Sequence, residues 1–199
     1  MSAFILHPRN KVVVLAPGSS LIDEQVKMIR ESGVYNIAIG DAGRVLFPDA
    51  DVLYHADAAW WYHYRGCPDV SSKKICIEPL NYSDVSRMYV SPSLTKGIDL
   101  NYPYLVTGNN SGYQAINLAM YCKPKEIILV GFDMKRRGVS HNVIGDHPKA
   151  IKRPADFNLF IENMNSLAQT LDNLGVKVYN CTLDTALQCF EQKELKDVL

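Results

Sequence analysis

The chain has 199 residues, of which 47% are hydrophobic and 21% charged, so it is long enough for one well-buried domain and too apolar for a disordered protein. Its 21 basic and 21 acidic residues give a formal charge of zero, which argues against a surface dominated by binding to nucleic acid or an anionic membrane. With no secretory leader and no apolar run of roughly 18 residues, we expect a cytoplasmic, single-domain protein (residues 1–199) that does not enter the membrane.

Two kinds of predicted element alternate in the first half of the chain. Residues 11–15 (KVVVL) predict a strand, and the turn 16–20 (APGSS) leads into apolar residues at helical spacing. Ser20 is predicted to cap this helix, and Gly33 suits the left-handed conformation that follows a last helical turn. Further strands are predicted at residues 34–39, 51–55 and 74–78.

The second half repeats the alternation after an irregular stretch. Residues 79–106 lack a clear period and are predicted to form a variable, lid-like segment with at most a brief strand at 88–90. Residues 126–130 (EIILV) predict a strand buried on both faces, because they are apolar almost throughout. The remaining elements are a helix at 109–121, a helix between Pro154 and Gly175, and a last strand at 176–181.

Strands that alternate with helices indicate right-handed crossovers and a mostly parallel sheet. The predicted fold is therefore Rossmann-like α/β, with helices on both faces of the sheet. Ligands of such folds bind outside the carboxyl ends of the strands. The site is therefore expected in the loops at residues 16–20, 40–43, 55–61, 107–112 and 131–147.

Two of these loops place glycine and small polar residues in front of a helix. The turn 16–20 offers backbone N–H groups and a positive helix end to a phosphate, although it is neither a dinucleotide fingerprint nor a Walker loop. The loop 107–112 offers several donors and close backbone approach. An ordinary turn with a helix cap is the alternative for both. The candidates are Pro17, Gly18, Ser19, Ser20, Thr107, Gly108, Asn109, Asn110 and Ser111.

The last of these loops concentrates ionisable groups. Histidine and carboxylate at this density indicate a general base or a divalent metal, although the spacing matches no standard zinc motif. A solvated surface loop is the alternative. The candidates are Gly131, Phe132, Asp133, Lys135, His141, Asp146 and His147.

Three further candidates lie at or just after the ends of the strands predicted at 34–39 and 51–55: Asp41, His55 and Asp57. The aromatic run that follows at 59–64 could stack on a base or sugar ring, with packing beneath the lid as the alternative. The five cysteines are an odd number without a CxxC pair, so we expect them to be reduced and mostly buried rather than a disulfide or zinc framework.

In order and spacing, three segments resemble a known family. APGSSL (16–21) is similar to the GNGPSL turn of the bacterial sialyltransferases that build lipooligosaccharides from a CMP-activated sugar, and 109–135 is similar to their glycine-helix-strand-GxD block. SHNVIGDHP (140–148) resembles the segment that supplies their base. The chain also resembles a related Rossmann-like group, common in phages, that includes archaeal 6-hydroxymethylpterin diphosphokinase-like proteins.

The resemblance implies a transferase that uses a nucleotide-activated donor and no cofactor. His147 would be the general base, with Asp133 and His141 beside it, and Lys135, which stands where those sialyltransferases have a tyrosine, would neutralise phosphate. The residues implied to hold the nucleotide or donor are Gly18, Ser19, Ser20, Asn109, Asn110 and Ser111.

Two other functions fit the same residues. In a Mg²⁺-dependent pyrophosphokinase, Asp133 and Asp146 would hold the metal against ATP phosphates. A non-catalytic protein of phage type would bind or sequester a nucleotide without turnover. For each of the three hypotheses, the transferase, the pyrophosphokinase and the sequestering protein, we expect a nucleotide or nucleotide-sugar as the partner. A homo-oligomer is compatible with each.

Overall fold

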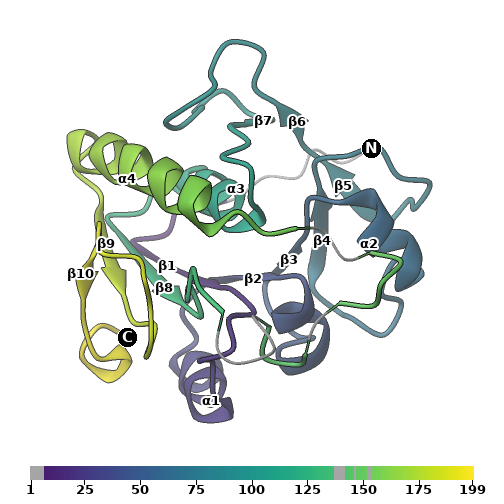
Figure 1. Cartoon of the computed structure of the whole chain (residues 1–199), viewed down its shortest axis with the longest axis horizontal. Coiled ribbons are helices and arrows are strands. Elements are labelled where there is room, and N and C mark those ends of the chain that lie inside the picture. Colours follow the sequence, from purple (N-terminus) through teal and green to yellow (C-terminus); the bar gives the residue numbers. More distant parts are fainter. Residues whose placement is uncertain (1–6, 137–141, 146, 152–153) are drawn as a thin grey trace.

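In the computed structural model, which describes residues 7–136, 142–145, 147–151 and 154–199, the chain forms an α/β fold around one large parallel sheet (Figure 1). Within these residues eight strands pair in the order β10-β9-β8-β1-β2-β3-β4-β5, and every neighbouring pair is parallel. The strands are β1 (Lys11–Leu15), β2 (Asn36–Ile39), β3 (Val52–Tyr54), β4 (Lys73–Cys76), β5 (Val85–Arg87), β8 (Glu126–Val130), β9 (Lys177–Asn180) and β10 (Glu191–Gln192).

Helices cover both faces of this sheet, as the sequence predicts. Val12 and Val14 of β1 face α3 (Ser111–Met120) and α4 (Phe157–Asn173), whereas Val13 and Leu15 face α1 (Asp23–Ser32). The short helix α2 (Ala58–His63) packs further along the second face. The alternation follows from the two-residue period of a strand, and it explains why β1 and β8 are apolar at almost every position.

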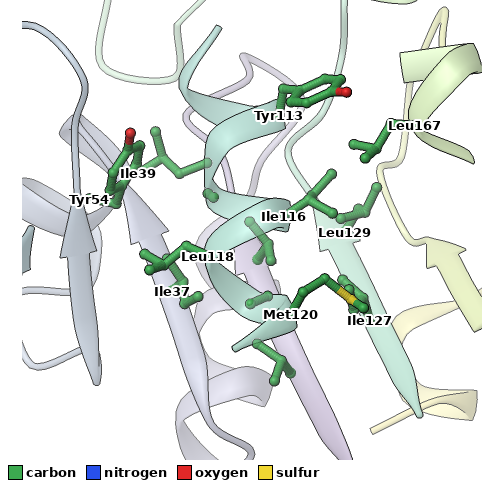
Figure 2. Close-up of a cluster of buried hydrophobic side chains, with 14 of the residues drawn as sticks. Ile37, Ile39, Tyr54, Tyr113, Ile116, Leu118, Met120, Ile127, Leu129 and Leu167 are labelled. Carbon is green, nitrogen blue, oxygen red and sulfur yellow. The ribbon is translucent and has the colours of Figure 1, made fainter. Parts of the chain in front are cut away.

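The core on the first face is centred on α3. Figure 2 shows Ile116 and Leu118 pointing from this helix toward the strands, where Ile37 and Leu129 belong to the same buried cluster. All four side chains are fully buried. This packing fixes the N-terminus of α3 above the carboxyl ends of the central strands, where the sequence predicts the ligand site.

The strands predicted at 11–15 and 126–130 have the observed bounds. The strand predicted at 74–78 begins one residue earlier and ends two residues earlier, as β4, and the other predicted strands and helices are shortened by one to three residues at their ends. The prediction for Ser20 is wrong: Ile22 precedes the first turn of α1 without a side-chain cap, because the Ser20 hydroxyl donates to Asp133 instead. Gly33 does end α1 in the left-handed conformation, with φ of 64°.

The segment 79–106 contains more regular structure than its sequence indicates. It supplies β5 to the main sheet, and β6 (Tyr89–Val90) pairs with β7 (Tyr104–Leu105) in a separate parallel pair. The Tyr113 hydroxyl of α3 donates to the Gly97 carbonyl oxygen and accepts from the Gly97 N–H. Strands of two or three residues carry too little periodicity to be recognised in the sequence. A lid function for the segment stays a prediction.

The direction in which strands are added reverses beside β1. From β1 the chain builds β2 to β5 on one side, and after α3 it returns to place β8 and β9 on the other. Such a reversal leaves a crevice at the carboxyl ends of the two strands that flank it.

All five cysteines are free thiols, four buried and Cys189 half-buried. Among the described residues, no helix combines the length and the apolarity that a bilayer crossing requires.

Candidate functional site

A pocket of about 220 Å³ occupies the crevice at the carboxyl ends of β1, β2, β3 and β8. All five predicted loops contribute to it. The predicted residues in its lining are Pro17, Gly18, Asp41, His55, Asn110, Ser111, Gly131, Phe132, Asp133, Lys135 and His147. Residues that the sequence did not single out complete it: Ala16, Ile39, Gly40, Gly112, Met134, Asn142, Ala155, Phe157 and Phe160.

Asp133 holds the first turn in place. One carboxylate oxygen accepts hydrogen bonds from the Ser20 amide at 2.8 Å and the Ser19 hydroxyl at 3.1 Å, and the other accepts from the Ser20 hydroxyl at 2.6 Å. Hydrogen bonds to a carboxylate are among the strong ones in proteins. The structure thus directs the two serine side chains at Asp133, while Pro17 and Gly18 line the pocket.

Two glycines let the turns after β1 and β8 touch. The Gly18 N–H donates to the Gly131 carbonyl oxygen at 3.0 Å, and Gly131 has φ of +74°. A Cβ on Gly131 would lie 2.1 Å from the Ala16 carbonyl oxygen, and one on Gly18 would lie 2.2 Å from Asp133 Oδ1. Only residues without a side chain permit this approach, so both turns are built to bring backbone to the pocket wall.

The loop that leaves β8 folds back over the same turn. The Val143 N–H donates to the Pro17 carbonyl oxygen at 2.8 Å, and Gly18 and Asn142 form an isolated antiparallel bridge. The Asn142 side-chain amide also approaches Asp41 Oδ2 at 3.4 Å. This return carries His147 to the pocket from a position far along the chain.

His147 lies against Asp41, which follows β2. Its Nδ1 is 3.1 Å from Asp41 Oδ2, within ion-pair distance although without the angle of a good hydrogen bond. Arg44 Nε donates to the other Asp41 oxygen at 2.9 Å. Burial opposes ionisation of Asp41, which is 1% exposed, but the contacts with His147 and Arg44 outweigh it and lower the pKa of this carboxyl. The ionised Asp41 therefore orients the imidazole and leaves its Nε2 for chemistry.

His55, at the end of β3, occupies a different environment from His147. The side chain stacks on Trp60 with ring centroids 4.5 Å apart and planes inclined by 10°. Burial, with a smaller contribution from His147, lowers the pKa of His55 to about 3, although Asp41 acts in the opposite direction. His55 is therefore a neutral imidazole near neutral pH.

This low pKa predicts a specific loss of stability in acid. The unfolded chain takes up a proton at His55 near pH 6.5, whereas the folded chain resists until about pH 3, so its contribution is complete above pH 6.5 and is lost as the pH falls. Between about pH 7.5 and 4.5 we expect the free energy of unfolding to fall by about 2 to 3 kcal/mol more in the wild type than in His55→Gln. Urea unfolding at both pH values measures this difference.

The control for this measurement is His63→Gln, because His63 is an exposed histidine of the neighbouring helix α2. It should keep the wild-type difference between the two pH values. If His55→Gln also kept it, His55 would not be the group that resists protonation.

The N-terminal loop of α3 divides between two pockets. Asn110 caps the helix, since its Oδ1 accepts from the Tyr113 N–H at 2.8 Å, and Asn110 and Ser111 line both pockets. Thr107, Asn109 and Asp57 line only the second, which has a volume of about 450 Å³. Gly108 has φ of +51° and packs against the Tyr113 ring. Asn110 is therefore a helix cap, the alternative that the sequence left open for this loop. Thr107, Gly108, Asn109 and Asp57 are not among the residues that line the first pocket.

Lys135 lines the first pocket and forms an ion pair with Asp184. Beside it Phe132 is buried, and its N–H donates to the Thr182 hydroxyl at 2.9 Å. Phe157 and Phe160 close the apolar side of the pocket. Both lie at the start of α4 with the spacing of an apolar helical stripe, a signal that does not separate core residues from pocket residues.

The predicted Mg²⁺ ligands are Asp133 and Asp146. His141 and Asp146 lie outside the described residues. Within the described part of the chain, no group of three His, Cys, Asp or Glu side chains is arranged to hold a metal ion. Both oxygens of Asp133 accept from serine donors. A Mg²⁺ requirement stays a prediction.

The order of the strands, the reversal beside β1 and the pocket at that reversal define the class of fold. The chain has a Rossmann-like α/β fold. No protein-family model matches the sequence, and no relative was found among curated proteins. Among solved structures, the fold is similar to that of the MAf glycosyltransferase from Magnetospirillum magneticum AMB-1, with a TM-score of 0.65 and 17% sequence identity. The similarity covers 100% of this chain and 35% of that one, so the chain spans about a third of the length of that enzyme.

Proposed function

We propose that this protein is a glycosyltransferase-like transferase that uses a nucleotide-activated sugar and His147 as the general base. The observation that carries the proposal is the contact of His147 with the buried Asp41, 3.1 Å apart, at the rim of a pocket beside the reversal of strand order. The similarity of the fold to a glycosyltransferase supports it. So does the sequence resemblance to sialyltransferases, which suggests a CMP-activated sugar.

In the proposed reaction, an acceptor hydroxyl attacks the anomeric carbon of the donor sugar while His147 Nε2 takes its proton. The new carbon–oxygen bond forms as the bond from this carbon to the nucleotide phosphate breaks, and the nucleotide leaves with the electron pair. A histidine suits this step because imidazole accepts protons near neutral pH. The helix end at Ser111 and the ammonium of Lys135 would stabilise the charge on the departing phosphate.

A thermal-shift screen of CMP, UMP, ADP, GDP and their sugar conjugates, with and without Mg²⁺, tests this function. A ligand that binds only the folded chain raises the midpoint of unfolding, by a free energy of about 2.7 kcal/mol at 100 times its Kd. We expect one nucleotide and its sugar conjugate to raise the midpoint without Mg²⁺, and CMP is the first candidate. Inorganic phosphate at the same ionic strength is the ligand control.

A negative charge introduced into the pocket tests whether the nucleotide binds there. Ser111→Asp puts a carboxylate at the start of α3, where the helix dipole tolerates it but an anionic nucleotide does not, and it should abolish the shift. Ser93→Asp, at an exposed serine outside both pockets, should leave it unchanged. Absence of a shift with any nucleotide would reject the proposal. A shift that requires Mg²⁺ would favour the pyrophosphokinase reading, and tight binding without turnover would favour a sequestering protein.

A further inference from the structure

His55 has one hydrogen-bonding nitrogen engaged by the protein and one directed elsewhere. Its Nδ1 accepts the Asp57 N–H at 3.1 Å, so in the neutral ring the proton must lie on Nε2. The Trp60 stack and the hydrogen bond from Trp61 Nε1 to the His55 carbonyl oxygen, at 3.0 Å, hold the residue in place. The structure therefore determines both the tautomer and the orientation of this ring.

The remaining nitrogen belongs to the pocket. His55 is 8% exposed, lines the pocket, and presents its Cδ2–Nε2 edge to Gly40, where a Cβ would lie 2.9 Å from Cδ2 and 3.6 Å from Nε2. Among the described residues, none accepts a hydrogen bond from Nε2. Nε2 is not completely enclosed by the protein, so it can donate a hydrogen bond to a group bound in the pocket.

The chemistry around Nε2 selects the type of group. His55 carries no charge, and the ionised Asp41 stands close enough to influence its protonation. A phosphate at this position would find no cation on His55, and the nearby Arg44 is already paired with Asp41. A sugar hydroxyl is uncharged and accepts one hydrogen bond while it donates another.

We propose that His55 is a fixed, neutral hydrogen-bond donor that positions a sugar hydroxyl of the nucleotide ligand through Nε2–H. The proposal rests on the proposed function, and it separates two roles: His147 exchanges a proton, whereas His55 holds the substrate without exchanging one. The hydroxyl belongs either to the ribose or to the transferred sugar, since both are polyols in the same ligand.

Calorimetric binding to the wild type, His55→Phe and His63→Phe tests the inference. The probes are the nucleotides of the thermal-shift screen (the panel nucleotides), their deoxyribose analogues and their sugar conjugates. Phenylalanine keeps a flat ring on Trp60 but has no donor, and His63 is an exposed histidine of α2. We expect His55→Phe to weaken binding about tenfold, the effect of losing one hydrogen bond, and His63→Phe to have no effect. Weakening of the ribonucleotide but not of its deoxy analogue assigns the ribose, and weakening of the sugar conjugate alone assigns the transferred sugar.

Nitrogen-15 NMR of the wild-type histidines gives a second readout that needs no variant. Across about pH 5 to 8 we expect His55 to stay in the Nε2–H form, despite Asp41, Asp57 and His147 nearby, and its Nε2–H resonance to move when a panel nucleotide or sugar conjugate is added. Wild-type binding that leaves both His55 readouts unchanged overturns this inference but not the proposed function. Absence of wild-type binding overturns both.

Discussion

Replacement of His147 by alanine is expected to lower the rate of sugar transfer by roughly 10²- to 10⁴-fold, the usual contribution of a general base. The effect should fall on kcat rather than on nucleotide affinity, because the imidazole acts on the acceptor proton. The side chain is partly exposed at the pocket, with Asp41 as its described ion-pair partner, so its loss should leave the fold intact. Steady-state kinetics with the donor identified by the thermal screen measures the change.

The pH profile of the same enzyme separates a base from a structural residue. Wild-type turnover should rise with pH as the general base loses its proton, and this limb should be absent in His147→Ala. His63→Ala, at an exposed histidine of α2, should reproduce the wild-type profile. Donor turnover that is untouched in His147→Ala would show that the base is another group.

Gly131→Ala is expected to be the most damaging single-methyl change in the site. The new Cβ would meet the Ala16 carbonyl oxygen at 2.1 Å, and φ of +74° adds strain that any L side chain would feel. Because both partners are backbone at the ends of the central strands β1 and β8, neither can move without opening the sheet. We expect the free energy of unfolding to fall by about 3 to 5 kcal/mol, from overpacking and backbone strain together.

Gly33→Ala is the matched control for this substitution. Gly33 has φ of +64° at the end of α1, and nothing lies within 4 Å of the position of its Cβ. It should therefore lose only the backbone term, about 1 kcal/mol. Denaturant unfolding of both variants compares them directly. Equal losses would mean that the turns after β1 and β8 are not in the close contact described above.

The fold could be predicted because its decisive signals are local. Residues 126–130 are apolar on both faces of a strand, the apolar positions of α4 keep a helical period, and Gly33 and Gly175 follow helices in the left-handed conformation. Alternation of such elements leaves few arrangements other than a parallel sheet. Short elements escaped prediction, among them β7, β10 and the π-helix η1 (Ala42–Leu46), because a few residues carry no measurable period.

Individual roles in the site could not be predicted with the same success. The sequence predicts Asp133 as a catalytic or metal-binding carboxylate and Ser19 and Ser20 as ligand-binding residues. The structure shows the Asp133 oxygens engaged by these two serines. His55 and His147 carry the same side chain, yet one is buried on Trp60 and the other lies against Asp41. Whether a polar group faces a ligand or another protein group depends on neighbours that are distant in the chain.

The sequence by itself therefore determined the class of fold and the set of loops that meet at one end of the sheet, because strand and helix periods and glycine positions are properties of neighbouring residues. Only the tertiary structure decided the pairing of Asp41 with His147, the tautomer of His55 and the contact between Gly131 and the turn after β1. These contacts join residues from different strands, and their chemistry follows from burial and distance, which arise only when the sheet has formed.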